Sequence, residues 1–274
     1  MTTETPLHLD EPVALPPPSP SGRLVLAAWM TTALIFLGLV LAWEAVVRLA
    51  AVPSYLLPAP SAILARLVER GPLFASNALT TLSEALAGFL VGGGIALLLA
   101  TVMVHSALAE RVLYPLALLV KVTPIVAVAP LFVIWFGFGP LPKVVIAALI
   151  TFFPVLVNAL AGLRAANPHA LEFLRSVGAG TGEIFFKLRV PGSLPYLFAA
   201  ARVAIPLALI GAMVGEWWGA SDGLGRMIFL ANSTLDMPTL FGAVIVLAGL
   251  GVGLTGLLAL AERHWLAWHE SVRQ

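Results

Sequence analysis

Two basic residues lie inside long apolar stretches of the chain, where charges are rarely found. Lys121 lies within residues 112–136, with Thr123 nearby, and Arg202 lies within residues 194–215. A charged side chain is costly in lipid, so it normally faces protein or water and marks the route of an ion or polar solute. We expect Lys121 to lie on such a translocation route. For Arg202 two interpretations stay open: a place on the route, or a side chain that extends to the lipid headgroups.

Two further polar residues are candidates for the same route, each with a structural alternative. Asn158 lies one turn after Pro154, and its amide can satisfy the backbone carbonyl that a proline leaves free, a role that we favour over solute contact. Glu216 precedes Trp217 and Trp218 at the end of an apolar stretch. These three residues fit a gate or a docking point, and equally an aromatic belt at the membrane interface.

Sequence motifs for catalysis or metal binding are scarce. The chain has no cysteine, which excludes disulfides, thiolate metal sites and a cysteine nucleophile. It has no Gly-x-x-x-x-Gly-Lys-Ser/Thr nucleotide loop and no His-Glu-x-x-His zinc motif. A membrane-embedded hydrolase is disfavoured, although Ser221 and Asp222 do not exclude one. We therefore expect no catalytic residue, no metal and no cofactor, and any ATP would have to bind another chain.

The composition predicts a membrane protein. The 274 residues are 60% hydrophobic and 11% charged, with a mean hydropathy of +0.99, and a soluble domain could not bury so much apolar surface. The net charge of +1 gives no indication of a nucleic-acid partner. We predict an all-α polytopic fold at residues 23–274, after a disordered proline-rich cytoplasmic tail at residues 1–22. Its six spans are expected at about 24–48, 79–104, 112–136, 143–163, 194–215 and 240–261.

Glycine and proline give three more expectations for these elements. Gly88 and Gly92 are spaced for a close helix-packing seam in the second span. The third span contains three prolines, each of which frees a backbone carbonyl that other parts of the protein must satisfy, so we expect it inside the bundle. Between the first two spans, an apolar stripe after Pro60 suggests a short helix lying on the membrane surface.

The distribution of basic residues predicts the orientation. With the amino terminus inside, eight basic residues lie in cytoplasmic segments and five outside, and Lys121 and Arg202 in the spans complete the fifteen. An excess of basic residues marks the cytoplasmic side. Both termini and the loop 164–193 are therefore expected in the cytoplasm.

The loop 164–193 has the pattern of two short helices joined by a glycine turn. Asn167 before Pro168 is a helix start. An apolar stripe follows at a spacing of three, with Glu172 and Arg175 beside it, and its members are Leu171, Leu174 and Val177. Gly178 stands where a left-handed residue ends a helix. Thr181 is expected to cap a second helix, which Pro191 closes.

The same loop resembles the EAA loop of permease subunits of bacterial ABC importers. The resemblance rests on Glu172, on Gly178 six residues later and on the segment 188–191, Leu-Arg-Val-Pro. Phe173 and Leu174 stand where that pattern has two alanines, and a valine replaces its leucine. The resemblance implies that the first helix docks into a groove on a separate cytoplasmic ATPase. The alternative is an amphipathic loop that lies at the membrane surface.

Other segments resemble the nitrate, sulfonate and taurine branch of these permeases. They are PSAILARL at 60–67, VKVTPIVAVAPLFVIWFGFG at 120–139, TFFPVLVNALAGLR at 151–164 and GEWWGASDGLGRMI at 215–228. The resemblance implies a homodimer of permease subunits in the inner membrane, two ATP-binding subunits and an extracytoplasmic solute-binding protein. It also implies a small anionic solute, for which a basic residue on the route makes chemical sense.

Two other functions stay open from the sequence. Importers of pyrimidines or other vitamin precursors look much the same in these segments. A self-sufficient secondary transporter would use intramembrane charges as ion sites. No intramembrane acid is expected to accompany Lys121 and Arg202, which disfavours coupling to protons or sodium.

Overall fold

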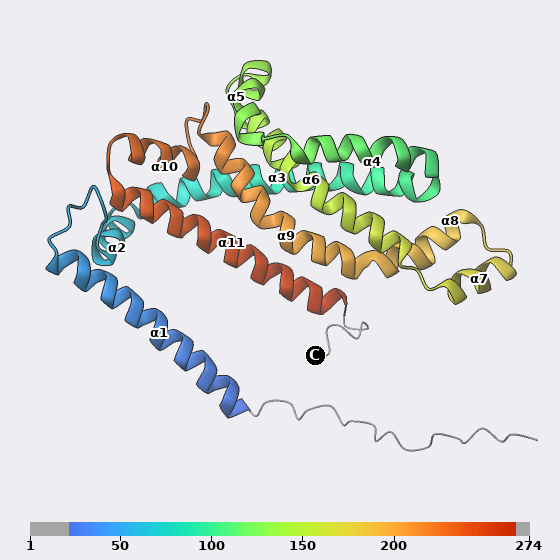
Figure 1. Ribbon diagram of the computed structural model, residues 1–274, viewed down its shortest axis with the longest axis horizontal. Coiled ribbons are helices and arrows are strands. Elements are labelled where there is room, and N and C mark those ends of the chain that lie inside the picture. Colours follow the sequence, from blue (N-terminus) through green and yellow to red (C-terminus); the bar gives the residue numbers. More distant parts are fainter. Residues whose placement is uncertain (1–21, 267–274) are drawn as a thin grey trace, which may run out of the picture. The chain divides into compact units, whose positions relative to one another are not determined.

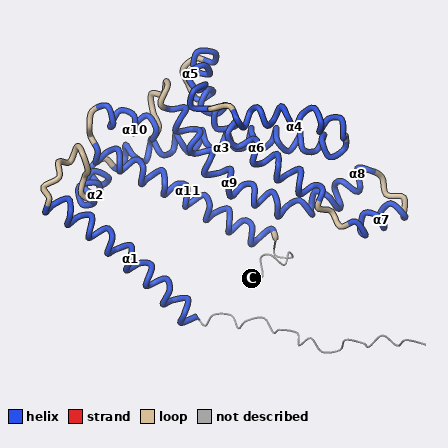
Figure 2. Tube along the Cα trace, in the orientation of Figure 1, coloured by secondary structure: helices blue, strands red, loops and turns tan. Residues whose placement is uncertain are grey.

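Every regular element in the described part of the chain is helical (Figures 1 and 2). The computed structural model describes residues 22–266, so the prediction of a disordered tail falls almost wholly outside the described residues. The chain divides into two units, residues 1–50 and residues 51–274. The first unit contains α1 (Gly22–Leu49). Within α1, Arg48 Nε lies 2.5 Å from Glu44 Oε1, one helical turn away.

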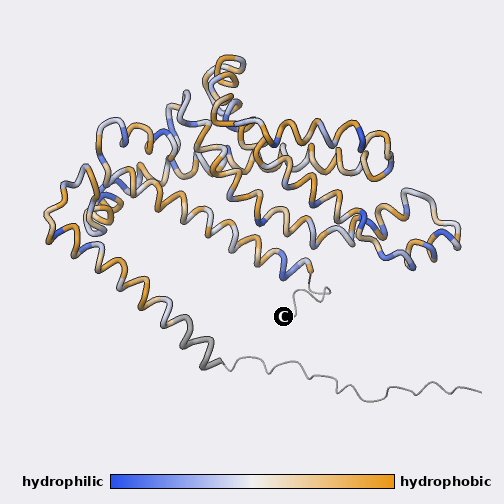
Figure 3. Tube along the Cα trace, in the orientation of Figure 1, coloured by the Kyte–Doolittle hydropathy of each residue, from blue (hydrophilic) through white to orange (hydrophobic). Residues whose placement is uncertain are grey.

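Three long helices form the core of the second unit. They are α3 (Gly71–His105), α6 (Pro140–Arg164) and α9 (Val190–Glu216), and α6 packs extensively against both of the others. Small side chains such as Ala96, Ala159 and Ala204 are fully buried where the helices meet. Figure 3 shows hydrophobic residues along much of these helices.

The predicted glycine seam is confirmed between α3 and α6. A Cβ atom on Gly88 would overlap the Cβ of Ala147, and one on Gly92 would lie 2.7 Å from Thr151 Oγ1. Close approach of helix backbones increases van der Waals contact, which drives helix association where the hydrophobic effect is weak. The seam therefore fixes the central helix pair.

The remaining helices surround this core. α2 (Pro60–Glu69) is the short helix that the sequence predicted. It packs against α11 (Met237–Trp265), as does α10 (Leu224–Ser233). A second apolar cluster joins α3, α10 and α11, and its buried members are Phe74, Ala78, Leu224, Met227 and Ala243.

The third predicted span is not one helix. It consists of α4 (Ala107–Val122) and α5 (Ile125–Phe136), which are bent by 97° at the break between them. Thr123 has ψ 126°, an extended conformation that follows from the clash between a proline ring and the residue before it. In the single chain α4 and α5 each bury one alanine, so the expected interior position stays a prediction. Within residues 22–266, five helices are long and apolar enough to span a membrane, and the bent pair is the sixth candidate.

Candidate functional site

The loop 164–193 begins with the predicted capped helix, α7 (Pro168–Ser176). The Asn167 side-chain oxygen accepts hydrogen bonds from the backbone N–H groups of His169, at 2.9 Å, and Ala170, at 3.4 Å. These donors have no partner inside the helix, so the cap satisfies them. The predicted start is confirmed.

Gly178 ends α7 in the predicted left-handed conformation, with φ +78°. Two backbone hydrogen bonds close the turn: Gly178 N–H donates to Arg175 O at 3.0 Å, and Ala179 N–H donates to Leu174 O at 2.9 Å. This pair of bonds defines a Schellman motif, in which the last carbonyls of the helix are satisfied. The direction in which the chain leaves α7 is therefore fixed by hydrogen bonds.

The apolar stripe of α7 is largely uncovered. Leu171 and Leu174 are half-buried, whereas Val177 is 63% exposed and the neighbouring Phe173 is 65% exposed. No residue of α7 is buried, and Glu172 is among its exposed side chains. Figure 1 shows α7 beyond the end of α6 and α9, as a projecting element. An exposed apolar surface at such a position is typical of a binding surface.

The second helix of the loop differs from the prediction. Gly180, not Thr181, is the capping residue of α8 (Thr181–Ile184), and Glu183 accepts from its N–H at 3.4 Å. Pro191 does not close the helix: α8 continues through a π-helical turn, η1 (Phe185–Arg189), into α9. A proline inside a helix clashes with the carbonyl four residues earlier, and the wider π turn before Pro191 accommodates its ring.

Lys121 and Thr123 come together at the break between α4 and α5. Both line a cavity of about 230 Å³ that also contacts Pro154. The Lys121 ammonium lies 4.7 Å from the centre of the Phe153 ring, a cation–π contact. Thr123 Oγ1 donates to the Leu119 carbonyl at 2.8 Å. Of the five expected route residues, these two share one cavity.

Asn158 and Arg202 have partners of their own. Asn158 Nδ2 donates to the carbonyl of Pro154 at 2.8 Å. The expectation about its bond is wrong in detail, because the carbonyl that Pro154 leaves free belongs to Ile150, one turn earlier. Arg202 forms an ion pair with Glu262 of α11. Glu262 lies one residue beyond the sixth span predicted at about 240–261, so the expectation that no intramembrane acid accompanies Arg202 stays a prediction.

Glu216 is fully buried at the end of α9 and holds the start of α10. It accepts from Thr81 Oγ1 at 2.6 Å and from the backbone N–H of Gly225 at 2.5 Å. Asn77 Oδ1 accepts from the Gly223 N–H at 2.6 Å, and Thr81 Oγ1 accepts from the next backbone N–H at 2.8 Å. The first donors of α10 are thus satisfied by α3 and α9, and the carboxylate suits the positive end of the helix dipole.

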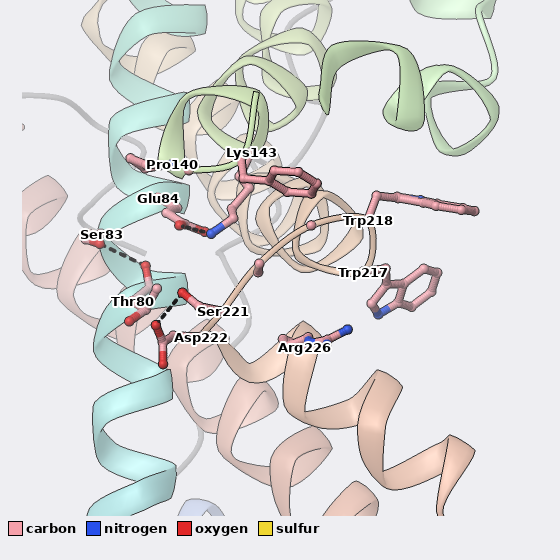
Figure 4. A pocket seen from close by; sticks show the side chains of 14 residues that line it. Thr80, Ser83, Glu84, Pro140, Lys143, Trp217, Trp218, Ser221, Asp222 and Arg226 are labelled. Atoms are coloured by element: carbon pink, nitrogen blue, oxygen red, sulfur yellow. Dashed lines mark hydrogen bonds and ion pairs between the residues drawn. The ribbon is translucent and has the colours of Figure 1, made fainter. Parts of the chain in front are cut away.

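A buried ion pair was missed by the sequence analysis. Glu84 of α3 accepts from Lys143 Nζ of α6 at 2.7 Å, and both side chains are more than nine-tenths buried. Figure 4 shows the pair in the wall of a cavity near the α9–α10 connection. The signal in the sequence was weak, because each residue stands close to the end of a predicted span, where a charge is ordinary.

Residues 219–223 match the Gly-x-Ser-x-Gly pattern of hydrolase nucleophiles, but their surroundings do not fit. That pattern requires a strand-to-helix turn, and here it lies in a connection between two helices. Ser221 Oγ donates to Asp222 Oδ2 at 2.6 Å. The described histidines lie in α7 or at the final residues of α3 and α11, at the other end of the long helices. The arrangement does not support a hydrolase.

Solved ABC transporters include chains with a similar fold. The MetNI methionine ABC transporter, in an inward-facing conformation, aligns with a TM-score of 0.64 and 17% identity, covering 72% of this chain and 98% of that chain. An amino acid ABC transporter with histidines aligns with a TM-score of 0.57 and 21% identity, covering 73% of this chain and 97% of that chain. At these identities the likeness shows the fold.

Curated relatives are similar over most of their length. The formylaminopyrimidine transport permease ThiX of Halalkalibacterium halodurans is 35% identical over 86% of this chain and 95% of its own. The riboflavin transport permease RibX of Chloroflexus aurantiacus is 36% identical, with 84% and 86% covered. The putative aliphatic sulfonates permease SsuC of Bacillus subtilis is 30% identical, with 89% of each covered.

The family assignment rests on a longer match than any single motif. Residues 88–266, well over half of the chain, match the family described as the inner membrane component of binding-protein-dependent transport systems. The match includes the loop 164–193 and the whole of α9, α10 and α11. It also includes the α6 residues that line the cavity at Lys121 and the cavity at Lys143. The chain therefore belongs to this family, and it is a multi-pass permease subunit of an ABC importer.

Proposed function

We propose that residues Leu171, Glu172, Leu174, Arg175, Val177 and Gly178 couple this permease to its ATP-binding subunit. The observation that carries the proposal is an α7 with an uncovered apolar stripe and a hydrogen-bonded end. Leu171, Leu174 and Val177 would fill a groove on the partner, and Glu172 would meet a basic residue at its edge. A helix that is fixed at both ends can pass on a displacement that a flexible loop would absorb.

The partners follow in outline from the family. Such a permease works with a separate ATPase and a solute-binding protein, and the chain has no nucleotide loop of its own. We further propose that two copies of the chain pair to form the translocation pathway, as the resemblance implies. The secondary-transporter alternative is set aside on family membership.

We also propose that both termini lie in the cytoplasm. The distribution of basic residues supports this orientation. Lys143 and Arg164 lie near opposite ends of α6, about 32 Å apart at roughly 1.5 Å per residue. The loop after α6 and the cavity at Lys143 are then on opposite sides of the membrane, with the loop facing the cytoplasm and the cavity facing out.

For the solute, we propose a small organic molecule with a planar heterocycle. Two relatives at 35–36% identity carry the names of a pyrimidine and a flavin permease. Of the two cations that the sequence analysis placed on the route, Arg202 is balanced by Glu262, which leaves Lys121 as the candidate for an anion. A small sulfonate or other anion is the second candidate, favoured by Lys121, whose described contact is an aromatic ring rather than an acid.

Crosslinking tests the coupling proposal directly, because the chain has no cysteine of its own. A photocrosslinker attached to Val177→Cys should capture the ATP-binding subunit in the assembled complex. The same reagent on Leu141→Cys, which is similarly exposed at the far end of α6, should not. Equal capture from both positions, or capture from Leu141→Cys alone, would refute the assignment of α7.

A further inference from the structure

A cavity of about 990 Å³ lies at the end of the helix bundle opposite α7. It is bounded by α3, by the first residues of α6 and by the connection between α9 and α10. Its volume is at the upper end of the range for small-molecule sites, roughly 300–1,000 Å³. Lys121, Thr123 and Asn158 are not among its lining residues, so it is separate from the cavity at the α4–α5 break.

The cavity has an aromatic side and a polar side. Figure 4 shows the indoles of Trp217 and Trp218 on one side, and Thr80, Ser83 and Asp222 on the other. Trp218 is 46% exposed, so a face of its ring is available for contact. Flat aromatic molecules stack favourably on such rings, whereas small inorganic anions gain nothing from them.

The cavity is lined by one ion pair and by two charged side chains, Asp222 and Arg226, that can contact a ligand. Glu84 and Lys143 neutralise one another. Asp222 and Arg226 form no ion pair with any described residue; Asp222 accepts from Ser221, and the Arg226 guanidinium lies 5.8 Å from the Phe229 ring. The cavity therefore offers one carboxylate that accepts hydrogen bonds and one guanidinium that donates them.

Two buried side-chain atoms beside the cavity have no hydrogen-bond partner among the described residues. Glu84 is 4% exposed, and within residues 22–266 its Oε2 atom has no hydrogen-bond partner. The indole nitrogen of Trp217 also has no hydrogen-bond partner within these residues. Buried polar groups are normally satisfied, and leaving them unpaired costs free energy. Both residues line the cavity, but these two atoms are buried inside its wall, so the polar contacts open to a ligand are those of Asp222 and Arg226.

We propose that this cavity is a receiving site for a planar heterocycle that bears amino groups. The ring would stack on the indoles, its amino group would donate to Asp222, and Arg226 would donate to a ring nitrogen or carbonyl oxygen. The inference rests on the proposed function and adds the place where the solute is first held by the permease. It also gives a reason for the neutral Glu84–Lys143 pair, which avoids a net charge that would favour anions.

Binding to the purified full-length chain in lipid nanodiscs tests this site. The probe is 4-amino-2-methylpyrimidine, with ethanesulfonate as the anionic comparison, and affinity is measured by titration calorimetry. Trp218→Leu and Asp222→Asn should each weaken pyrimidine binding by about tenfold, the loss of one stacking or hydrogen-bonding contact. Trp265→Leu, at a more exposed tryptophan on α11, and Glu69→Gln on α2 should leave the affinity unchanged.

Other outcomes separate this site from the proposed function. Trp218→Phe should bind the pyrimidine almost as tightly as the unmodified chain, because phenylalanine keeps a stacking surface. Normal binding by Trp218→Phe would show that the weaker binding of Trp218→Leu comes from the lost ring and not from a folding defect. The proposal is overturned if the unmodified chain does not bind the pyrimidine, if Trp218→Leu and Asp222→Asn bind it normally, or if ethanesulfonate binds more tightly. The crosslink from Val177→Cys is independent of the cavity, so it still reports on coupling in each of these cases.

Discussion

At the scale of single residues, the lysines of the long apolar segments differ in how their charge is balanced. Lys143 is buried and paired with Glu84, whereas the described contact of Lys121 is with the Phe153 ring. A cation over an aromatic face keeps its full charge and can still attract a polar group. We therefore expect Lys121 to contact a passing solute, and Lys143 to hold α3 and α6 together.

Lys121→Met should lower uptake by a reconstituted importer by about tenfold, the effect of losing one charge-assisted contact. Assembly with the ATP-binding subunit should be unaffected, because Lys121 lies far along the chain from α7. Arg48→Met in α1, which removes an exposed cation, serves as the control. Normal transport by Lys121→Met would return this residue to a structural role.

Lys143→Met should lower the free energy of unfolding by about 3–5 kcal/mol, because it leaves the Glu84 carboxylate buried without its partner. The double variant Glu84→Gln, Lys143→Met should recover most of that loss, since it removes both charges. Thermal unfolding in detergent measures both effects. A double variant as unstable as the single one would show that the pair does not act through charge compensation.

At the scale of elements, Gly178 determines how α7 ends. Its φ of +78° strains any residue with a Cβ atom, although no other group is near enough to clash with one. Gly178→Val should cost roughly 1 kcal/mol or more and redirect α7 without touching a transmembrane contact. The variant should insert into the membrane normally and lose binding of the ATP-binding subunit, measured by co-purification.

Gly180→Ala is the matched control for that change. Gly180 lies two residues away with an ordinary φ of −72°, and a Cβ atom there meets nothing within 4 Å. It should keep both binding and transport. If Gly178→Val co-purifies with the ATP-binding subunit and transports at the normal rate, α7 is better described as a surface-lying amphipathic segment.

The seam between α3 and α6 allows a comparison of adjacent glycines. Gly92→Ala would press a methyl group against Thr151 Oγ1 and the α6 backbone, whereas Gly93→Ala meets nothing within 4 Å. We expect Gly92→Ala to destabilise the chain by about 1–3 kcal/mol through overpacking, and Gly93→Ala to have little effect. Equal unfolding temperatures for the two variants would argue against a close seam.

The elements that the sequence predicted well are those whose causes are local. Asn167 and Gly178 act within one turn of α7, so their types and spacing are sufficient to place its ends. The 97° bend after Thr123 was not predicted, because Pro115 and Pro130 occur in the same segment without breaking it. The pair of Glu84 and Lys143 was missed because it depends on packing between residues 59 apart.

At the scale of the whole molecule, the chain is the membrane-spanning subunit, and ATP hydrolysis is expected on another subunit. Its family places the ATPase on a separate subunit, and its sequence has no nucleotide loop. The purified chain should therefore hydrolyse no ATP, and turnover should appear when the ATP-binding subunit is added. Turnover by the chain alone that a mutation within it abolishes would contradict this division of labour.

The uninterrupted helix from Thr181 to Glu216 has a mechanical consequence. Its 36 residues run from the turn after α7 to the carboxylate that holds the start of α10. Such a helix is stiff along its axis, because compressing it would break backbone hydrogen bonds, and the π turn and the interior prolines Pro195 and Pro206 are the points where its hydrogen bonding is irregular. Rotation of this helix at the α7 end would be transmitted to Glu216, so movements at the two ends of the bundle would be coupled through one helix.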